Sequence, residues 1–353
     1  MRIAFFTPTR HDCGIADYAR HLLRHLRPPL DIKVVPAERL ESVSSYGELG
    51  RTMSAADVAH IQYEHGFFRL NDAPAANFDA LLGAIRVPKV MTLHCLPLED
   101  AHWQRHLEDP SLSFLVHSRH HQAILRARGA RGIIEMTPHP APPRTASRMS
   151  PSAYRSAHGL DGKIVLTIFG FTKPHKGYEL ALDALDHLPQ QTVLLIAGGA
   201  QDEWDRRHQS DLLRQARERR LGSRVVVSGY VPAPEVGAAL GASDVVLAPF
   251  RSMTASGSIA TALAWERPVV AARLEQTAEL QAEFGCLALF DTGDAADLGR
   301  QIDRVLNDPA LRQSLIDGAH RFRRRCTYRA LAARTRRMWE HAVGGSSPPC
   351  GDS

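Results

Sequence analysis

The sequence has few cysteines and no long apolar run, and both absences limit what the protein can be. Its five cysteines in 353 residues are scattered, odd in number and without a C-x-x-C pair, which disfavours a disulfide framework and a zinc site. No apolar stretch approaches the ~20 residues that cross a bilayer. The apolar run at residues 3–6 is too short for a signal peptide and predicts a buried strand. We therefore expect a cytoplasmic protein of a reducing compartment, without a bound metal.

A large excess of one charge is also missing. The 43 Lys and Arg residues and 38 Asp and Glu residues leave a formal net charge of +5, and no basic stretch is interleaved with aromatic residues. Nucleic acid is therefore not an expected partner. A modestly basic surface suits anionic small molecules such as nucleotide diphosphates. At roughly 150 residues per domain, the length predicts two domains.

Short apolar runs alternate with amphipathic segments along the chain, a pattern typical of parallel α/β sheets covered on both faces. The predicted strands are residues 2–7, 32–35, 58–62, 90–93, 164–170, 193–197, 225–228, 245–248 and 269–271. The predicted helices are residues 14–26, 78–85, 118–128, 178–188, 209–219, 235–240, 258–265, 295–306 and 309–324. Two successive sets of this kind predict two doubly wound domains that face each other across a cleft.

The alternation fails between residues 136 and 155, where five prolines and several serines follow one another closely. Proline lacks an amide donor and restricts the residue before it, so this segment predicts a linker between domains. The predicted N-terminal domain is residues 1–145, and the predicted C-terminal domain is residues 155–327. Residues 344–353 are mostly Gly, Ser and Pro, which predicts a disordered tail.

In open parallel sheets, ligands bind beyond the carboxyl ends of the strands, and in the first half of the chain polar or flexible residues follow three predicted strands. Gly14 follows the first strand and allows a ligand to approach the backbone closely. Glu64 and His65 follow the strand at 58–62, and His94 follows the strand at 90–93. A plain loop, a solvated turn or a loop cap explains each of these residues equally well when it is taken alone.

The second half carries a stronger signal, because two of its strand-to-helix loops have features that suit a diphosphate. Lys173 and Lys176 lie between the strand at 164–170 and the next helix, where lysine charge and a helix N-terminus attract anions. Ser256, Gly257 and Ser258 precede another helix, with little side-chain bulk to keep a phosphate from the backbone amides. A well-capped helix explains one of these loops but not both.

These residues resemble the family-4 glycosyltransferases, which have the GT-B fold, over roughly residues 1–343. The order and spacing of the matching stretches carry the resemblance. The stretches are residues 13–18, 62–66, 92–94, 170–177, 229–231, 242–249 and 267–270. The resemblance implies two Rossmann-like domains, a nucleotide-sugar donor held mainly by the second domain, retention of the anomeric configuration and no requirement for a metal or other cofactor.

The resemblance also implies roles for individual residues. Lys176 and His94 are the expected catalytic residues, the first pairing with the donor diphosphate and the second contacting the transferred sugar. The other expected donor-diphosphate residues are Gly14, Lys173, Ser256, Gly257 and Ser258. The expected nucleotide-binding residues are Tyr230, Val231 and Thr261. Glu64 and His65 belong to the acceptor or sugar side, and a helix at residues 328–343 is expected to cross back to the first domain.

The chain departs from the family pattern at two places. Phe171 stands where the family has an arginine, and we expect Lys173 to supply the missing charge from two residues away. Met253 and Thr261 stand where the family has a pair of glutamates, one contacting the sugar and the other the ribose. Recognition of the ribose and the sugar therefore lacks its usual carboxylates.

The sequence thus predicts a glycosyltransferase that acts on a small-molecule, glycan or lipid-linked acceptor in polysaccharide, glycolipid or secondary-metabolite glycosylation. A catalytically inactive GT-B partner or nucleotide-sugar-binding protein stays open as an alternative, as does an epimerase on the same fold. A nicotinamide dehydrogenase is disfavoured because no G-x-G-x-x-G follows the first strand. A basic helix leaves peripheral contact with the inner membrane face open, although a solvated basic surface explains it as well. Its residues are Arg119, His120, His121, Arg126 and Arg128.

Overall fold

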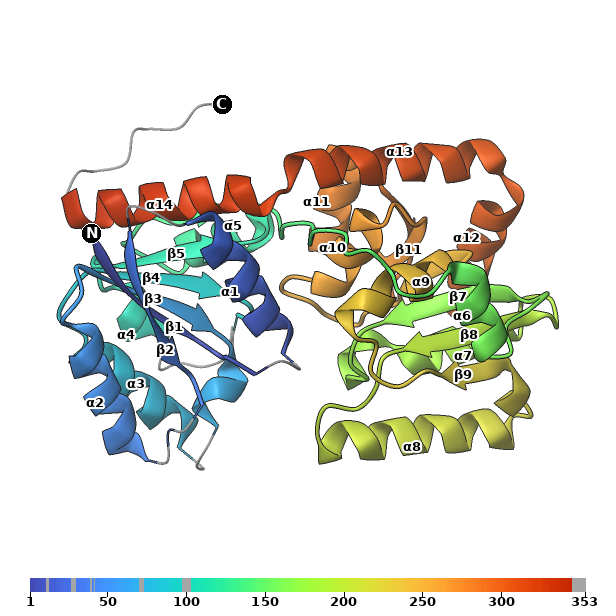
Figure 1. Cartoon of the computed structure of the whole chain (residues 1–353), viewed down its shortest axis with the longest axis horizontal. Coiled ribbons are helices and arrows are strands. Elements are labelled where there is room, and N and C mark those ends of the chain that lie inside the picture. The colour runs from blue at the N-terminus through green and yellow to red at the C-terminus, as the bar shows by residue number, and fades with distance from the viewer. Residues whose placement is uncertain are drawn as a thin grey trace. The chain divides into compact units, whose positions relative to one another are not determined.

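The chain forms two compact units in the computed structural model, which describes residues 1–10, 13–26, 30–38, 40, 42–69, 73–96 and 103–344. Unit 1 combines Met1–Pro140 with Cys326–Ser353, and unit 2 is Ala141–Arg325 (Figure 1). The last helix of the chain therefore belongs to the unit that the N-terminus begins. Apart from Gly344, the tail predicted at residues 344–353 lies outside the described residues.

Unit 1 contains a six-stranded parallel sheet in the order β2-β1-β3-β4-β5-β6. Its strands are β1 (Arg2–Thr7), β2 (Asp31–Pro36), β3 (Val58–Tyr63), β4 (Lys89–Leu93), β5 (Leu112–Val116) and β6 (Ile134–Met136). Four of these strands, β1, β3, β4 and β5, are buried on both faces along almost their whole length, as expected for a sheet covered by helices on each side. The order of the strands reverses between β1 and β3, which makes that point the topological switch of the sheet.

Helices cover both faces of this sheet because each has one apolar side. Tyr18 and Leu22 of α1 and Leu331 and Trp339 of α14 share one buried cluster with β1, β3 and β4. Helices α2 and α3 pack against the opposite face in a second cluster. The helices of unit 1 are α1 (Gly14–His25), α2 (Val43–Met53), η1 (His65–Phe68), α3 (Pro74–Ala84), α4 (Gln104–Leu107), α5 (Arg119–Ala127) and α14 (Tyr328–Gly344).

Unit 2 contains a second six-stranded parallel sheet, in the order β12-β11-β10-β7-β8-β9. Its strands are β7 (Ile164–Phe169), β8 (Thr192–Ala197), β9 (Val225–Val227), β10 (Val245–Ala248), β11 (Val269–Ala272) and β12 (Leu287–Phe290). Counted within the unit, this is the dinucleotide-fold order 3-2-1-4-5-6. Its switch point lies between β7 and β10, which pair directly. The predicted α/β fold of two doubly wound units is confirmed.

The helices of unit 2 again cover both faces of the sheet. Helices α7, α8 and α12 contribute Leu182, Leu212 and Ile302 to one large core cluster. The helices are α6 (Pro151–Ala157), η3 (Pro174–Lys176), α7 (Tyr178–Leu185), α8 (Glu203–Glu218), η4 (Gly222–Arg224), η5 (Ala233–Glu235), α9 (Val236–Gly241), α10 (Gly257–Ala264), α11 (Glu275–Phe284), α12 (Ala295–Asn307) and α13 (Pro309–Arg325).

The segment predicted as a linker, residues 136–155, differs from the prediction at its end. Ser150 accepts a hydrogen bond from the amide of Ala153, and Pro151 occupies the first turn, so the serines and proline begin helix α6. Earlier in the segment, Arg144 donates to the carbonyl of Ala264, and Thr145 donates to the carbonyl of Ala233. Residues 144–145 are thereby bound to unit 2.

Two further observations concern the predicted contact with a membrane. Among the basic residues predicted on α5, His121 is buried and shares a 2.7 Å hydrogen bond with Ser118. Contrary to the prediction of a basic surface on this helix, His121 is not part of such a surface. Among the described residues, no helix is long and apolar enough to span a bilayer.

Candidate functional site

The loop after β7 folds back across the switch point of the second sheet. Gly170 adopts a φ of +96° and Gly177 a φ of +67°, which favour glycine, and between them a 3-10 turn carries Lys176. The Lys176 Nζ donates to the carbonyl of Phe169 at 3.0 Å. A Cβ at Gly170 would lie 2.8 Å from that Nζ. The positive φ, together with the limited space beside the ammonium group, therefore favours glycine at position 170.

Lys176 is a buried cation, since only 7% of it is exposed. Burial, and to a smaller extent the charge of Lys173, lowers the pKa of Lys176 from 10.5 to about 7. An ammonium group held in this way gains from an anion that replaces its lost hydration. Strongly shifted lysines of this kind are common at functional sites.

The N-terminus of α10 lies beside this lysine loop. The Ser256 Oγ caps α10 by accepting from the amide of Ile259 at 3.1 Å, while the amides of Gly257 and Ser258 belong to the first turn and have no partner within the helix. The Cβ position at Gly170 is 3.8 Å from the Ser258 Cβ. The two loops that the sequence singled out thus meet at Gly170, and there lysine charge and a helix N-terminus can act on one anion.

Lys173 is engaged elsewhere, in contrast to the expectation that it replaces the family's arginine. Its Nζ lies 2.8 Å from the buried Asp205 carboxylate and 3.4 Å from Asp202. Phe171, at the arginine position, stacks on the half-exposed Tyr230 with ring centroids 6.2 Å apart. Val231 is buried beside Tyr230. The stacked rings of Phe171 and Tyr230 therefore give this edge of unit 2 an aromatic surface suited to a flat base.

The positions of the family's two glutamates carry no acid in the structure either. The Thr261 Oγ1 donates to the carbonyl of Gly257 at 2.6 Å, within α10. Nearby Glu266 is bound by Arg144, His320 and Arg323, and hydrogen bonds from these side chains, which outweigh its partial burial, lower its pKa to about 2. This carboxylate has a structural role.

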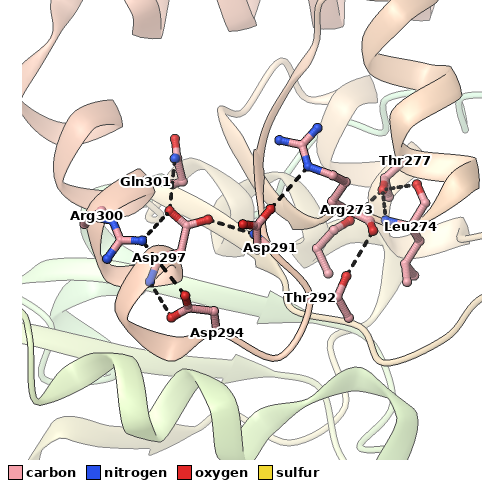
Figure 2. Close-up of polar contacts among 10 residues, drawn as sticks. Arg273, Leu274, Thr277, Asp291, Thr292, Asp294, Asp297, Arg300 and Gln301 are labelled. Atoms are coloured by element: carbon pink, nitrogen blue, oxygen red, sulfur yellow. Dashed lines mark hydrogen bonds and ion pairs between the residues drawn. The ribbon is translucent and has the colours of Figure 1, made fainter.

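The acidic loop after β12 has a structural role as well (Figure 2). Asp294 caps α12 by accepting from the amide of Asp297, and Asp297 accepts from the amide of Asp291 at 2.7 Å. Arg300 and Gln301 donate to the other oxygen of Asp297. These carboxylates are occupied by the loop itself, so they do not replace the family's glutamates.

In unit 1, the predicted residues cluster after β1, β3 and β4. Gly14 begins α1, and a Cβ built there has open space within 4 Å. Glu64 precedes the 3-10 helix η1, whose first residue, His65, donates its amide to the Cys95 Sγ. Glu64 and His65 follow β3 and Gly14 follows β1, so they flank the switch point of this sheet, where ligands bind in open α/β folds.

His94 lies at the end of β4 in a group of imidazole and aromatic rings. Its Nε2 is 2.7 Å from the amide oxygen of Gln62. The rings of Tyr18 and His94 pack edge to face, with their centroids 4.9 Å apart. Burial, followed by the charges of His117 and His139, lowers the pKa of His94 well below 6.5. The His94 ring is therefore neutral at physiological pH and offers hydrogen bonds rather than charge.

The sequence interpretation missed the residues that surround His94. His60, Gln62 and Thr92 are fully buried polar residues on β3 and β4, and His117 and His139 lie 5.3 Å apart beside Tyr18. The spacing of two between His60 and Gln62, and between Thr92 and His94, was the available signal, because residues two apart share a face of a strand. No group of three or more His, Cys, Asp or Glu residues in the described part of the chain is arranged to hold a metal ion.

Comparison with known proteins agrees with this geometry. Residues 162–308 match the family described as "Glycosyl transferases group 1". A 2-deoxystreptamine glucosyltransferase of Streptomyces kanamyceticus is 28% identical over 154 residues, which cover 42% of this chain and 38% of that relative. The chain thus matches well under half the length of this curated relative.

Solved structures match along nearly the whole chain. Sucrose-phosphate synthase from Thermosynechococcus elongatus has a TM-score of 0.79 at 18% identity, covering 98% of this chain and 100% of that one. Anabaena HepE in complex with UDP and glucose has a TM-score of 0.75 at 18% identity, with 96% and 99% covered.

These findings define the class. Residues 162–308 match the group 1 glycosyltransferase family, and the chain has the GT-B fold that the solved neighbours share. The enzyme class predicted from the sequence, a glycosyltransferase, agrees with both.

Proposed function

We propose that the protein transfers a sugar from a nucleotide-diphosphate sugar to an acceptor, with retention of configuration and without a metal requirement. The observation that carries the proposal is the meeting of Lys176 and the N-terminus of α10 at Gly170. Both features stabilise negative charge, and both lie at the switch point of the sheet in the matched domain. The UDP complex of the structural neighbour HepE supports a uridine nucleotide as the first probe.

The chemistry follows from where charge develops. When the bond between the sugar C1 and the diphosphate oxygen breaks, negative charge builds on the leaving diphosphate, and the acceptor oxygen forms the new bond to C1. Lys176 and the amides of Gly257 and Ser258 would stabilise that charge. The acceptor's proton would pass to the leaving phosphate on the same face of the sugar, which is consistent with retention.

The remaining roles are proposed for the residues beside these groups. Tyr230, stacked on Phe171, would hold the nucleotide base. In unit 1, His94 would contact the transferred sugar, and Gly14, Glu64 and His65 would lie on the acceptor and diphosphate side. The acceptor would be a small molecule, a glycan or a lipid-linked sugar.

Replacing Lys176 by Ala tests the proposal. Loss of one charge-stabilising donor typically costs ~3 kcal/mol of barrier, so we expect kcat to fall by about two orders of magnitude. The measurement is UDP release from UDP-glucose and other nucleotide sugars, preceded by thermal-shift screening to find the donor, and repeated with a metal chelator. Lys163→Ala is the matched control, since Lys163 is exposed just before β7, at the other end of the same strand.

A second candidate function is a nucleotide-sugar-binding partner protein without catalytic activity. Met253 and Thr261, in place of the two acids, favour it. Thermal stabilisation by a nucleotide sugar with neither hydrolysis nor transfer would select this candidate. An equal rate in Lys176→Ala and wild type would show that the assigned diphosphate site is wrong.

A further inference from the structure

Side chains of unit 1 form a continuous hydrogen-bond chain from α14 to His94. Trp339 Nε1 donates to His60 Nδ1 at 2.9 Å. The other ring nitrogen, His60 Nε2, lies 2.9 Å from the Thr92 Oγ1 and 2.9 Å from the side-chain amide of Gln62. The far end of that amide lies 2.7 Å from His94 Nε2. Trp339, His60, Gln62 and Thr92 are all fully buried.

Trp339 determines which nitrogen of His60 carries the proton. An indole N–H can only donate, so the His60 Nδ1 that faces it must accept. Burial lowers the pKa of His60 to about 3, so the ring is neutral and has a single N–H. That proton is therefore on Nε2, which faces the Thr92 Oγ1 and the side-chain amide of Gln62.

Gln62 transmits this constraint to the next ring. With the amide nitrogen of Gln62 toward His60 and its oxygen toward His94, two N–H donors would face each other at His60. The two ends of an amide have nearly the same shape, and their assignment follows from hydrogen-bond complementarity. The oxygen therefore belongs beside His60 and the NH₂ beside His94, whose Nε2 must then accept.

We infer that Trp339, His60 and Gln62 are positioning residues that hold His94 as the tautomer with its proton on Nδ1. His94 makes no hydrogen bond through Nδ1 to any residue that the structure describes. Resting on the proposed function, in which His94 contacts the sugar, this N–H is a donor fixed in advance for a sugar oxygen. The selected substrate is one that accepts a hydrogen bond at that position.

The tautomers can be measured without any assay of activity. The full chain is labelled with ¹⁵N-histidine, and the ring nitrogens of His60 and His94 are assigned from the signals lost in His60→Gln and His94→Gln. We expect a protonated Nε2 for His60 and a protonated Nδ1 for His94. A His94 ring with its proton on Nε2 would overturn the inference.

Two variants test whether the constraint passes along the hydrogen bonds from Trp339 to His94. Gln62→Met removes the link to His94 but leaves the Trp339 contact, so we expect His60 to keep its tautomer and His94 to become a mixture. Trp339→Phe removes the first donor, so both rings should become mixtures. Trp103→Phe is the control, because Trp103 is equally buried in unit 1 and its Nε1 has no partner among the described residues; both rings should keep their tautomers.

The same variants separate this inference from the proposed function. We expect kcat for release of UDP from UDP-glucose to fall about tenfold in Gln62→Met, the worth of one hydrogen bond, and to stay unchanged in Trp103→Phe. Expected tautomers in a protein that releases no nucleotide from any of the screened nucleotide sugars would refute the transferase function, but they would leave standing the inference that Trp339, His60 and Gln62 hold the His94 tautomer. If His94 kept a single tautomer in both Gln62→Met and Trp339→Phe, the inference that Trp339, His60 and Gln62 position His94 would be refuted, whatever the activity.

Discussion

Lys176 shows how a single residue connects burial to function. Its ammonium group makes one hydrogen bond among the described residues, to the carbonyl of Phe169, and the like charge of Lys173 acts on it. Asp205, which is the partner of Lys173, only partly offsets this. A bound diphosphate would supply the negative charge that Lys176 lacks in the free protein. The site is therefore preorganised to bind an anion.

This arrangement predicts that donor binding depends on pH. With a pKa of about 7 in the free protein, Lys176 is charged below pH 7 and loses its proton as the pH rises, whereas bound diphosphate raises its pKa. Affinity for UDP-glucose, whose diphosphate keeps its charge over this range, should therefore weaken about tenfold from pH 6 to pH 8. Isothermal titration calorimetry measures it. Lys176→Met should bind weakly at both pH values, and a wild-type affinity that does not change with pH would contradict the prediction.

At the scale of elements, the capped N-terminus of α10 brings backbone amides to the switch point. Ser256 fixes the first turn through its hydrogen bond to Ile259, and the loop before it is tied to the lysine loop by a bond from the Arg251 amide to the carbonyl of His175. A Cβ at Gly177 would lie 2.0 Å from the carbonyl oxygen of Pro249. The loops after β7 and β10 thus pack backbone against backbone, and each holds the other in place.

We expect Ser256→Ala to weaken both stability and donor binding. Losing an N-cap costs ~1 kcal/mol, or about 2–4 °C in melting temperature, and a frayed first turn should weaken UDP-glucose binding about fivefold. Ser150→Ala is the matched control, because Ser150 caps α6 in the same unit through the amide of Ala153. It should lower the melting temperature similarly while leaving the dissociation constant unchanged. Equal losses of affinity in the two variants would show that α10 has no special role.

At the scale of the molecule, the last helix is part of the first unit although more than 180 residues of unit 2 precede it. Helix α14 packs on the same face as α1, and Arg334 adds a 3.1 Å ion pair to Glu135 of β6. Trp339 then reaches the centre of the sheet at His60. The first unit is therefore complete only once α14 has been made.

Leu331→Ala tests this dependence, since Leu331 is 1% exposed in the shared cluster. Such a substitution costs ~2–5 kcal/mol, and hydrogen exchange should show lost protection in β1 and β3 of unit 1 but not in β7 and β8 of unit 2. The exposed Arg337 on the same helix provides the control variant Arg337→Ala. Equal loss of protection in both units would mean that they unfold together.

The sequence by itself determined the alternation of strands and helices, and hence the two doubly wound sheets, because hydrophobic periodicity is a local property. It indicated the loops at Lys176 and Ser256 for the same reason, since glycines, lysines and cap residues are recognisable where they stand. Short elements such as β5 and β12 were missed. Their apolar runs are no longer than those inside a buried helix, and only pairing in a sheet distinguishes them.

Tertiary structure decided everything that depends on which distant residues meet. Strand order placed the loops after β7 and β10 side by side. Packing also determined that Lys173 forms an ion pair with Asp205, whereas Lys176 has no carboxylate partner among the described residues. The contact between Trp339 and His60 joins residues 279 positions apart. No local pattern encodes such a contact, because it arises only when a sheet and a helix formed at opposite ends of the chain share one core.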